Sequence, residues 1–236
     1  MKIISPLLAS LALLAWTEPA RATVNLWVSD DDGGLSTDPV LGSSGIAVYC
    51  SSDPFWTVVI SSGVAYPPAV GQGTLSAPVM DLAVHATSVS TTGERLHPLV
   101  LTFAADGFGP SSLPADAKLS GYFLGDTIQP VTFNTFYSAA NELVPNPSAT
   151  ALTSSGTLLD PSYNGEWTGG AGSLDSPYSL SEVVTIQGSY TDGGSYSLDA
   201  SIVIPVPEPT TLVAGALLLL PVGTSVLRTL RKSRNT

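Results

Sequence analysis

The sequence predicts an all-β protein in which residues 23–204 form an antiparallel β-sandwich of about 8 to 11 strands. Short runs rich in β-branched and aromatic residues alternate with period two. The segments between these runs contain the Gly, Asn, Asp and Pro that turns require. No helical pattern separates the runs as a βαβ fold would demand, and a jelly-roll variant of the sandwich is also compatible with the pattern.

The N-terminus, residues 1–22, is predicted to be a secretory signal peptide. Lys2 precedes an apolar stretch over residues 3–16, and Ala20 and Ala22 form an A-x-A cleavage site. The apolar stretch is short for a membrane span. We therefore expect cleavage after Ala22 and an exported mature chain.

Three acidic residues, Asp30, Asp31 and Asp32, follow the first predicted strand, 24–29. Calcium favours oxygen ligands in flexible loops, so this cluster is a candidate weak calcium site, and calcium is the one candidate cofactor. The spacing does not fit an EF-hand, because Gly34 stands at the fifth position. A solvated turn is the alternative interpretation.

Cys50 is the only cysteine in the chain, so an exported domain cannot form an internal disulfide. It alternates with Ile46 and Val48 and is therefore expected to share their face of a strand. The simplest interpretation is a buried small apolar residue, and a reactive or intermolecular thiol is the alternative.

The remaining strands are predicted by the same alternation of apolar and polar residues, at 46–50, 55–61, 78–89, 97–105, 117–125, 131–138, 180–190 and 195–204. Two hairpins are predicted among them. One joins 78–89 to 97–105 with a turn near Thr92 and Gly93. The other joins 180–190 to 195–204 through Asp192, Gly193 and Gly194, residues that tolerate positive φ.

No residue pattern indicates a catalytic site. The sequence contains no G-x-S-x-G motif, and its two histidines, His85 and His97, lie in or beside predicted strands. The glutamates sit in unrelated contexts and suggest no acid pair for glycoside hydrolysis. A hydrolase would need two carboxylates, or a serine and a histidine, to converge in a cleft.

Glycan binding is a second possibility, because aromatic rings on exported β-sandwiches can contact sugars. Trp167 and Tyr163 lie in a Gly-rich segment, 162–172, which is expected to be a loop. These two residues are the candidate glycan contacts. The alternative is that Trp167 covers one end of the sandwich.

The charge of the chain excludes nucleic acid as a partner. Arg95 and Lys118 are the only basic residues between 23 and 209, a segment that contains almost all of the 19 acidic residues. Such a surface repels anionic polysaccharide unless a divalent cation bridges the two, whereas a neutral glycan is indifferent to it.

The C-terminus has three successive parts. Residues 205–209 are a Pro-rich linker that contains Pro207, Glu208 and Pro209, and residues 210–227 carry no charge. As a helix, 210–227 would span about 27 Å at about 1.5 Å per residue, close to the thickness of a bilayer core. The basic tail, 228–236, is expected to stay in the cytoplasm; its cations are Arg228, Arg231, Lys232 and Arg234.

This order of a Pro-Glu-Pro, an apolar span and a short basic terminus resembles the PEP-CTERM sorting signal of Gram-negative and related bacteria. The resemblance covers only the C-terminal part, from Val206 to Thr236, and the cations are spread more widely than in many members. It implies recognition by an exosortase, a membrane-embedded cysteine-type transpeptidase, which removes the tail. It also implies a link to exopolysaccharide and biofilm. A GPI signal normally ends in its apolar segment rather than in cations.

Together these features predict a non-enzymatic, exported protein of the cell surface or extracellular matrix, anchored in the membrane as a precursor. A glycan-binding module is the first alternative function and a secreted hydrolase is the second.

Overall fold

The structure is a computed structural model of the chain. It describes residues 23–30, 40–42, 46–52, 54–65, 78–89, 97–125, 129–143, 149–175, 177–188 and 193–204. The predicted signal peptide, Pro-rich linker, membrane helix and basic tail lie outside these residues. Within them every regular element is a strand, and none of their segments is a helix long and apolar enough to cross a membrane.

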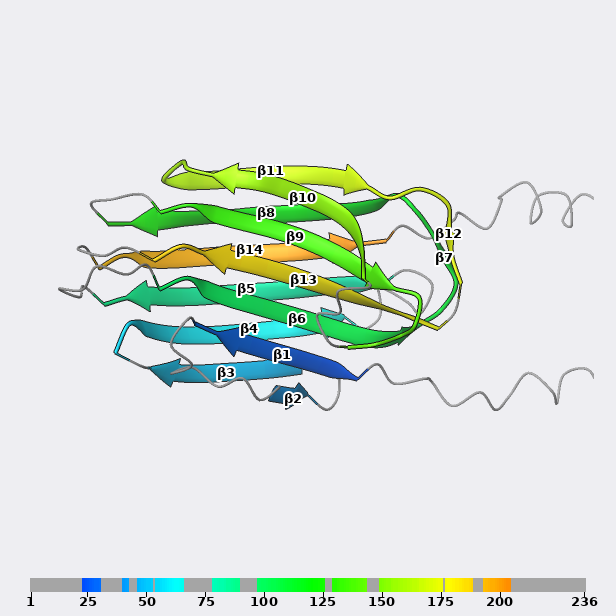
Figure 1. The fold of residues 1–236 in the computed structure, drawn as a ribbon, viewed down its shortest axis with the longest axis horizontal. Coiled ribbons are helices and arrows are strands. Elements are labelled where there is room, and N and C mark those ends of the chain that lie inside the picture. The colour runs from blue at the N-terminus through cyan, green and yellow to red at the C-terminus, as the bar shows by residue number, and fades with distance from the viewer. Residues whose placement is uncertain are drawn as a thin grey trace, which may run out of the picture. The chain divides into compact units, whose positions relative to one another are not determined.

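The described residues form two six-stranded sheets that lie one over the other (Figure 1). Sheet A has the order β10 (Thr150–Leu158), β9 (Val131–Ser138), β13 (Tyr178–Ile186), β6 (Leu99–Phe108), β1 (Val24–Ser29) and β2 (Val40–Gly42). Sheet B has the order β11 (Ser162–Gly169), β8 (Ala115–Leu124), β14 (Ser195–Val203), β5 (Val79–Ser88), β4 (Trp56–Ala65) and β3 (Ile46–Ser52). A short pair, β7 (Ser111–Ser112) and β12 (Ser173–Leu174), lies at one end.

The predicted all-β class and antiparallel pairing are confirmed. Every pair of neighbouring strands is antiparallel, and each strand predicted from alternation is present. The alternation did not reveal β10, β11 or the short strands β2, β7 and β12. It also ended this strand too early, at residue 105, because β6 continues to Phe108.

Both predicted hairpins are wrong. β5 belongs to sheet B and β6 to sheet A, and likewise β13 belongs to sheet A and β14 to sheet B. β5 pairs with β14 and β4, whereas β6 pairs with β13 and β1. Each connection therefore crosses from one sheet to the other. Turn residues mark where the chain reverses, but they do not decide whether the next strand pairs with the previous one or packs across the core from it.

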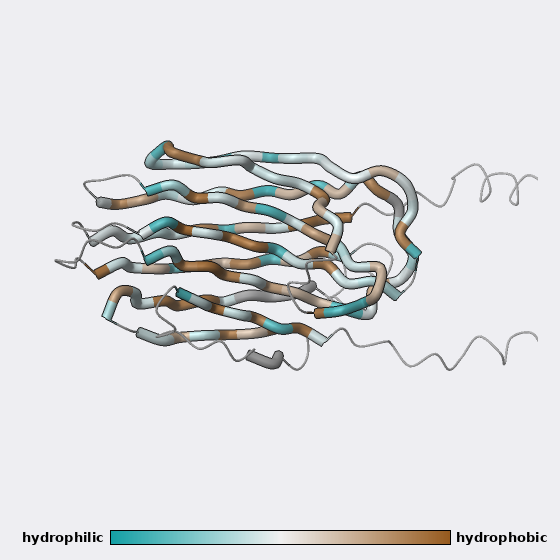
Figure 2. The backbone as a smooth tube through the Cα atoms, viewed as in Figure 1, coloured by the Kyte–Doolittle hydropathy of each residue, from teal (hydrophilic) through white to brown (hydrophobic). Residues whose placement is uncertain are grey.

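An apolar layer between the sheets forms the core. Along each strand alternate side chains point into this layer, so brown and teal alternate along the strands in Figure 2. The largest fully buried side chains come from both sheets and include Trp56, Tyr178, Tyr196, Phe103, Phe108 and Phe133. A buried aromatic with a polar tip needs a partner for it, and the Trp56 Nε1–H donates to the His97 carbonyl oxygen at 2.8 Å.

The Gly-rich segment expected to be a loop is instead strand β11. It pairs with β8 from Ser162 opposite Tyr122 to Gly169 opposite Ala115. Its last glycine is required by close approach rather than by a turn, because a Cβ on Gly169 would collide with the Leu152 carbonyl oxygen of β10. Glycine at this position lets β11 pass close to β10. In the sequence alone, a glycine needed for such close packing cannot be distinguished from a glycine in a flexible loop.

Glu182 is an exception in the core, because it is a carboxylic acid with no solvent-exposed surface. It lies on β13 between Phe103 of β6 and Thr135 of β9, and it points inward with Leu180 and Val184. Neither carboxyl oxygen makes a well-formed hydrogen bond. Burial raises the pKa of Glu182 well above its usual range, the charges of Asp81 and Asp199 add to this, and the Ile202 backbone offsets only part of it. The folded state therefore favours the protonated form of Glu182.

This burial predicts a stability that declines as pH rises. Below about pH 4 the carboxyl is protonated in both folded and unfolded chains, so it carries no penalty. Above that, the unfolded chain ionises first, and folding loses up to about 1.4 kcal/mol per pH unit until the folded pKa is reached. Glu182→Gln removes this loss, so its free energy of unfolding should exceed that of the wild type by a margin that grows from pH 4 to pH 7 in urea titrations.

Glu166→Gln is the matched control, because Glu166 is exposed on the surface of sheet B. The difference in the free energy of unfolding between Glu166→Gln and the wild type should show no comparable growth with pH. Parallel stability curves for Glu182→Gln and the wild type would contradict the assignment of a buried neutral carboxyl.

Candidate functional site

The outer face of sheet B, which points away from the core, presents an exposed tyrosine among small polar side chains. Tyr122 of β8 is 47% exposed, and it is the one aromatic residue among the exposed large hydrophobic side chains of the described residues. Directly opposite it are Ser162 of β11 and Ser197 of β14, and His85 of β5 stands beyond Ser197. Period-two alternation points all four side chains outward.

The neighbouring row of the same face is also polar. Asn164, Ser120 and Asp199 lie opposite one another on β11, β8 and β14. We call the two rows together the Tyr122 patch, which consists of Tyr122, Ser162, Ser197, His85, Asn164, Ser120 and Asp199. The patch combines one flat aromatic ring with hydroxyl, amide, imidazole and carboxyl groups.

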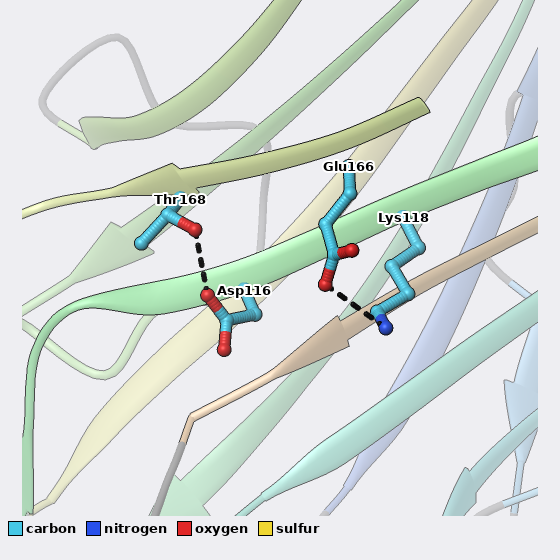
Figure 3. A network of polar contacts seen from close by, with 4 residues as sticks. All are labelled: Asp116, Lys118, Glu166 and Thr168. Atoms are coloured by element: carbon cyan, nitrogen blue, oxygen red, sulfur yellow. Dashed lines mark hydrogen bonds and ion pairs between the residues drawn. The ribbon is translucent and has the colours of Figure 1, made fainter. Parts of the chain in front are cut away.

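Two further rows beside the patch are joined by polar contacts between β8 and β11 (Figure 3). Lys118 Nζ lies 2.9 Å from Glu166 Oε1, and Thr168 Oγ1 donates to Asp116 Oδ1 at 2.8 Å. Lys118 is the only lysine or arginine among the described residues, and its charge is already engaged by Glu166. An anionic ligand would therefore meet no unpaired lysine or arginine on the described part of this face.

Two carboxyl groups converge at the other side of the patch. Asp81 on β5 lies diagonally across from Asp199 on β14, so two carboxyl groups of like charge are neighbours on this face. Partial loss of solvent around Asp81 raises its pKa most, the charge of Asp199 adds to this, and the pKa reaches about 6. The pair therefore carries less than two full negative charges in mildly acidic solution.

These groups do not form a recognisable hydrolytic site. Asp81 and Asp199 are diagonal neighbours on one face of sheet B, rather than two carboxyl groups placed across a cleft as glycoside hydrolysis requires. His85 stands opposite Ser197, but no hydrogen bond joins these two described side chains. His97, the second histidine, is buried and stacks on Phe55 with ring centroids 3.6 Å apart.

The predicted glycan contacts, Tyr163 and Trp167, do not form an exposed platform, and that prediction is wrong. Tyr163 is only 7% exposed, and burial raises its pKa to about 12. Trp167 packs against the core, with its ring 6.3 Å from that of Phe133. Both residues point inward from β11, so the outward positions beside them belong to Ser162, Asn164 and Glu166.

Cys50 is exposed, which corrects the expectation of a buried residue. It does share a face of β3 with Ile46 and Val48, as predicted, but this is the outer face of sheet B. Ala47 and Tyr49 point inward instead, with Ala47 buried and Tyr49 packed against the core. Both faces of β3 are largely apolar, so alternation alone did not distinguish the inner face from the outer one.

The calcium prediction concerns Asp30, Asp31 and Asp32, of which only Asp30 is among the described residues, directly after β1. In the described part of the chain no three His, Cys, Asp or Glu residues cluster as a metal site would require. The predicted cleavage site at Ala20 and Ala22, the sorting motif and the terminal cations also lie outside the described residues.

Sequence reasoning missed Tyr122, although a signal for it was present. In the segment 117–123 the inward positions are Ala117, Leu119 and Phe123, which places Tyr122 on the opposite face. What the sequence did not show is which polar residues surround it, because Ser162, Ser197 and His85 come from strands far apart in the chain.

No family model matches the sequence, and no curated protein matches it significantly. Among solved structures, the N-terminal cellulose-binding domain from Cellulomonas fimi β-1,4-glucanase C is 10% identical, with 81% of this chain and 99% of that chain covered and a TM-score of 0.25. TmCBM61 in complex with β-1,4-galactotriose is 13% identical, with coverages of 73% and 86% and a TM-score of 0.23. A structure described as "CBM4 structure and function" is 10% identical, with coverages of 49% and 78% and a TM-score of 0.26. Scores this low carry no argument about what this chain binds.

The carboxyl pair gives a prediction about titration. Asp199→Asn removes the like charge beside Asp81, so the pKa of Asp81 should fall from about 6 part of the way toward 3.8, with the burial contribution retained. Carboxyl carbon shifts followed by NMR between pH 3 and pH 8 measure this change. Asp116→Asn, on the same face but bonded to Thr168, is the control and should leave Asp81 unchanged. An Asp81 titration that is the same in Asp199→Asn and the wild type would show that the two carboxyls do not interact.

Proposed function

We propose that this chain is an exported, non-enzymatic protein of the cell surface or extracellular matrix whose β-sandwich binds a neutral glycan through the Tyr122 patch. The observation that carries this proposal is the position of Tyr122. It is the exposed aromatic of the described surface, and it stands in the middle of a row of serine side chains.

The chemistry of the patch suits a sugar ring. The faces of pyranose rings carry C–H groups that pack on an aromatic ring, while their edges carry hydroxyl groups. Tyr122 offers the flat apolar surface and a polar hydroxyl tip. Ser197, Ser162 and Asn164 offer donors and acceptors at the level of the sheet, within reach of sugar hydroxyls around a ring stacked on Tyr122.

The charges around the patch favour an uncharged ligand. The chain has a net charge of −11, and Lys118 is engaged with Glu166. An acidic polysaccharide would be repelled by this surface, whereas a neutral polysaccharide would not be.

The proposed location rests on the two ends of the chain. The signal peptide pattern at 1–22 supports export, and the PEP-CTERM-like segment supports a membrane-anchored precursor that an exosortase-type transpeptidase processes. Delivery to the surface or matrix would bring the Tyr122 patch to exopolysaccharide, which is where a glycan-binding module could act.

Substitution of Tyr122 tests the binding proposal. Tyr122→Ala should lower affinity for a neutral polysaccharide by about tenfold, equivalent to about 1.4 kcal/mol, because the stacking surface is lost. Tyr122→Phe should keep most of the affinity. Affinity electrophoresis in gels that contain neutral or acidic polysaccharides, chosen by a glycan array, measures the change.

Leu124→Ala is the matched control, since Leu124 is on the same strand and face and is 62% exposed. It should bind like the wild type. Binding that is indifferent to Tyr122→Ala, or that requires an acidic polysaccharide, would contradict the proposal.

The sorting proposal is tested at Glu208, because a simple membrane anchor and a sorting signal both need the apolar span and the cations, but only sorting needs the Pro-Glu-Pro. Glu208→Ala should leave membrane insertion intact and block removal of the tail. Mass spectrometry in the native host should show a C-terminally shortened wild type and a full-length variant. Equal processing of the two, or cleavage of neither, would indicate an ordinary single-pass anchor.

A further inference from the structure

One row of side chains crosses the outer face of sheet B through all six of its strands, from β11 to β3 (Figure 1). Each member lies directly opposite the next in the register of neighbouring strands. We call it the cross-strand row, and its members in order are Ser162, Tyr122, Ser197, His85, Val59 and Cys50. The first four belong to the Tyr122 patch, so the row continues the patch onto β4 and β3.

The cross-strand row is accessible along its length. All of its members are exposed except Ser197, which is partly buried. Tyr122 and Val59 expose 47% and 43% of their surfaces. These two apolar contacts are three strand spacings apart, or about 14 Å at about 4.8 Å each. A single sugar ring cannot touch both, whereas a chain of several linked sugars can.

Polar groups fill the interval between the two apolar contacts. Ser197 and His85 lie there and offer a hydroxyl and an imidazole, both of which can exchange hydrogen bonds with sugar hydroxyls. The row therefore alternates surface for the faces of sugar rings with groups for their edges.

The charges of this face favour a path across the strands. No member of the cross-strand row is an acid, a lysine or an arginine. Asp199 lies one row away, and Asp81 lies two rows away. A ligand that ran along β8 instead would cover Lys118 and Asp116, and removing such polar groups from water is costly.

We propose that the ligand is an unbranched neutral polysaccharide that lies across the strands along the cross-strand row, with sugar units on Tyr122 and Val59. This path, which rests on the proposed function of the Tyr122 patch, adds the direction of the chain, the need for several linked units and a contact outside the patch. The twist of the sheet turns the face along the row, and rotation about glycosidic linkages lets an extended chain follow it.

Chain length is the first test, with disaccharides and hexasaccharides of β-1,4-linked glucose, mannose and galactose as probes. Calorimetric titration of the full-length protein in a mild detergent measures affinity. At least one hexasaccharide should bind about tenfold or more tightly than its disaccharide, because only the longer chain reaches from Tyr122 to Val59. Its binding should also be weakened by Tyr122→Ala.

Val59→Ser removes the second apolar contact, so it should weaken hexasaccharide binding and leave disaccharide binding unchanged. Ile46→Ser is the matched control, since Ile46 is 58% exposed on the same face but two rows from the cross-strand row. It should bind both sugars like the wild type. Circular dichroism checks that both variants fold.

Cys50 reports directly on the position of the chain, because it ends the row and is the only cysteine. At a concentration ten times its Kd, the hexasaccharide should slow alkylation of Cys50 by iodoacetamide by up to about tenfold. The disaccharide should not. Ile46→Cys combined with Cys50→Ser moves the thiol about 14 Å along β3, at about 3.4 Å per residue, and should react at the same rate with and without sugar.

Three results would place the ligand elsewhere on the sheet while leaving Tyr122 as its contact. They are equal affinity for the two chain lengths, an unprotected Cys50 in the hexasaccharide complex, and equal losses of affinity in Val59→Ser and Ile46→Ser. Binding of none of these sugars, or binding that is indifferent to Tyr122→Ala, would instead refute the proposed function together with the cross-strand path.

Discussion

Burial of one apolar layer between two sheets is the constraint on which the rest of this domain depends. The chain has a single cysteine and so has no internal disulfide to stabilise the sandwich. The free energy of folding must therefore come from inward side chains such as Trp56, Phe103 and Tyr196. Because strands alternate with period two, each inward residue also fixes what its neighbours present to solvent. The Tyr122 patch and the exposure of Cys50 on β3 both follow from this packing.

The acidic groups that the fold brings together are Glu182, Asp81 and Asp199. Glu182 lies inside the core without an ion partner, and Asp81 lies diagonally across from Asp199 on the outer face of sheet B. For Glu182 and Asp81 the folded state raises the carboxyl pKa, since burial and like charges disfavour ionisation.

Sheet B joins two surfaces of different chemistry. The Tyr122 patch lies over β11, β8, β14 and β5, where polar side chains surround one ring. The outer face of β3 carries the exposed Ile46 and Val48, and neither β3 nor β4 contains a charged residue. The exposed ion pair of Lys118 with Glu166 joins β8 to β11 beside the first of these surfaces.

The sequence by itself determined the all-β class, the position of most long strands and, in several of them, which residues face inward. These are local properties, because alternation and turn residues are read within a few positions of one another. Pairing was decided only by the tertiary structure. The strands at 78–89 and 97–105 are adjacent in the chain yet lie in different sheets, and the Gly-rich segment 162–172 contains β11 because β8 and β10 lie beside it. The tertiary structure also decided the exposure of Cys50, because both faces of its strand are apolar and only the packing of neighbouring strands determines which face is inward. It likewise decided which residues surround Tyr122, because these come from distant strands that only the long-range register brings together.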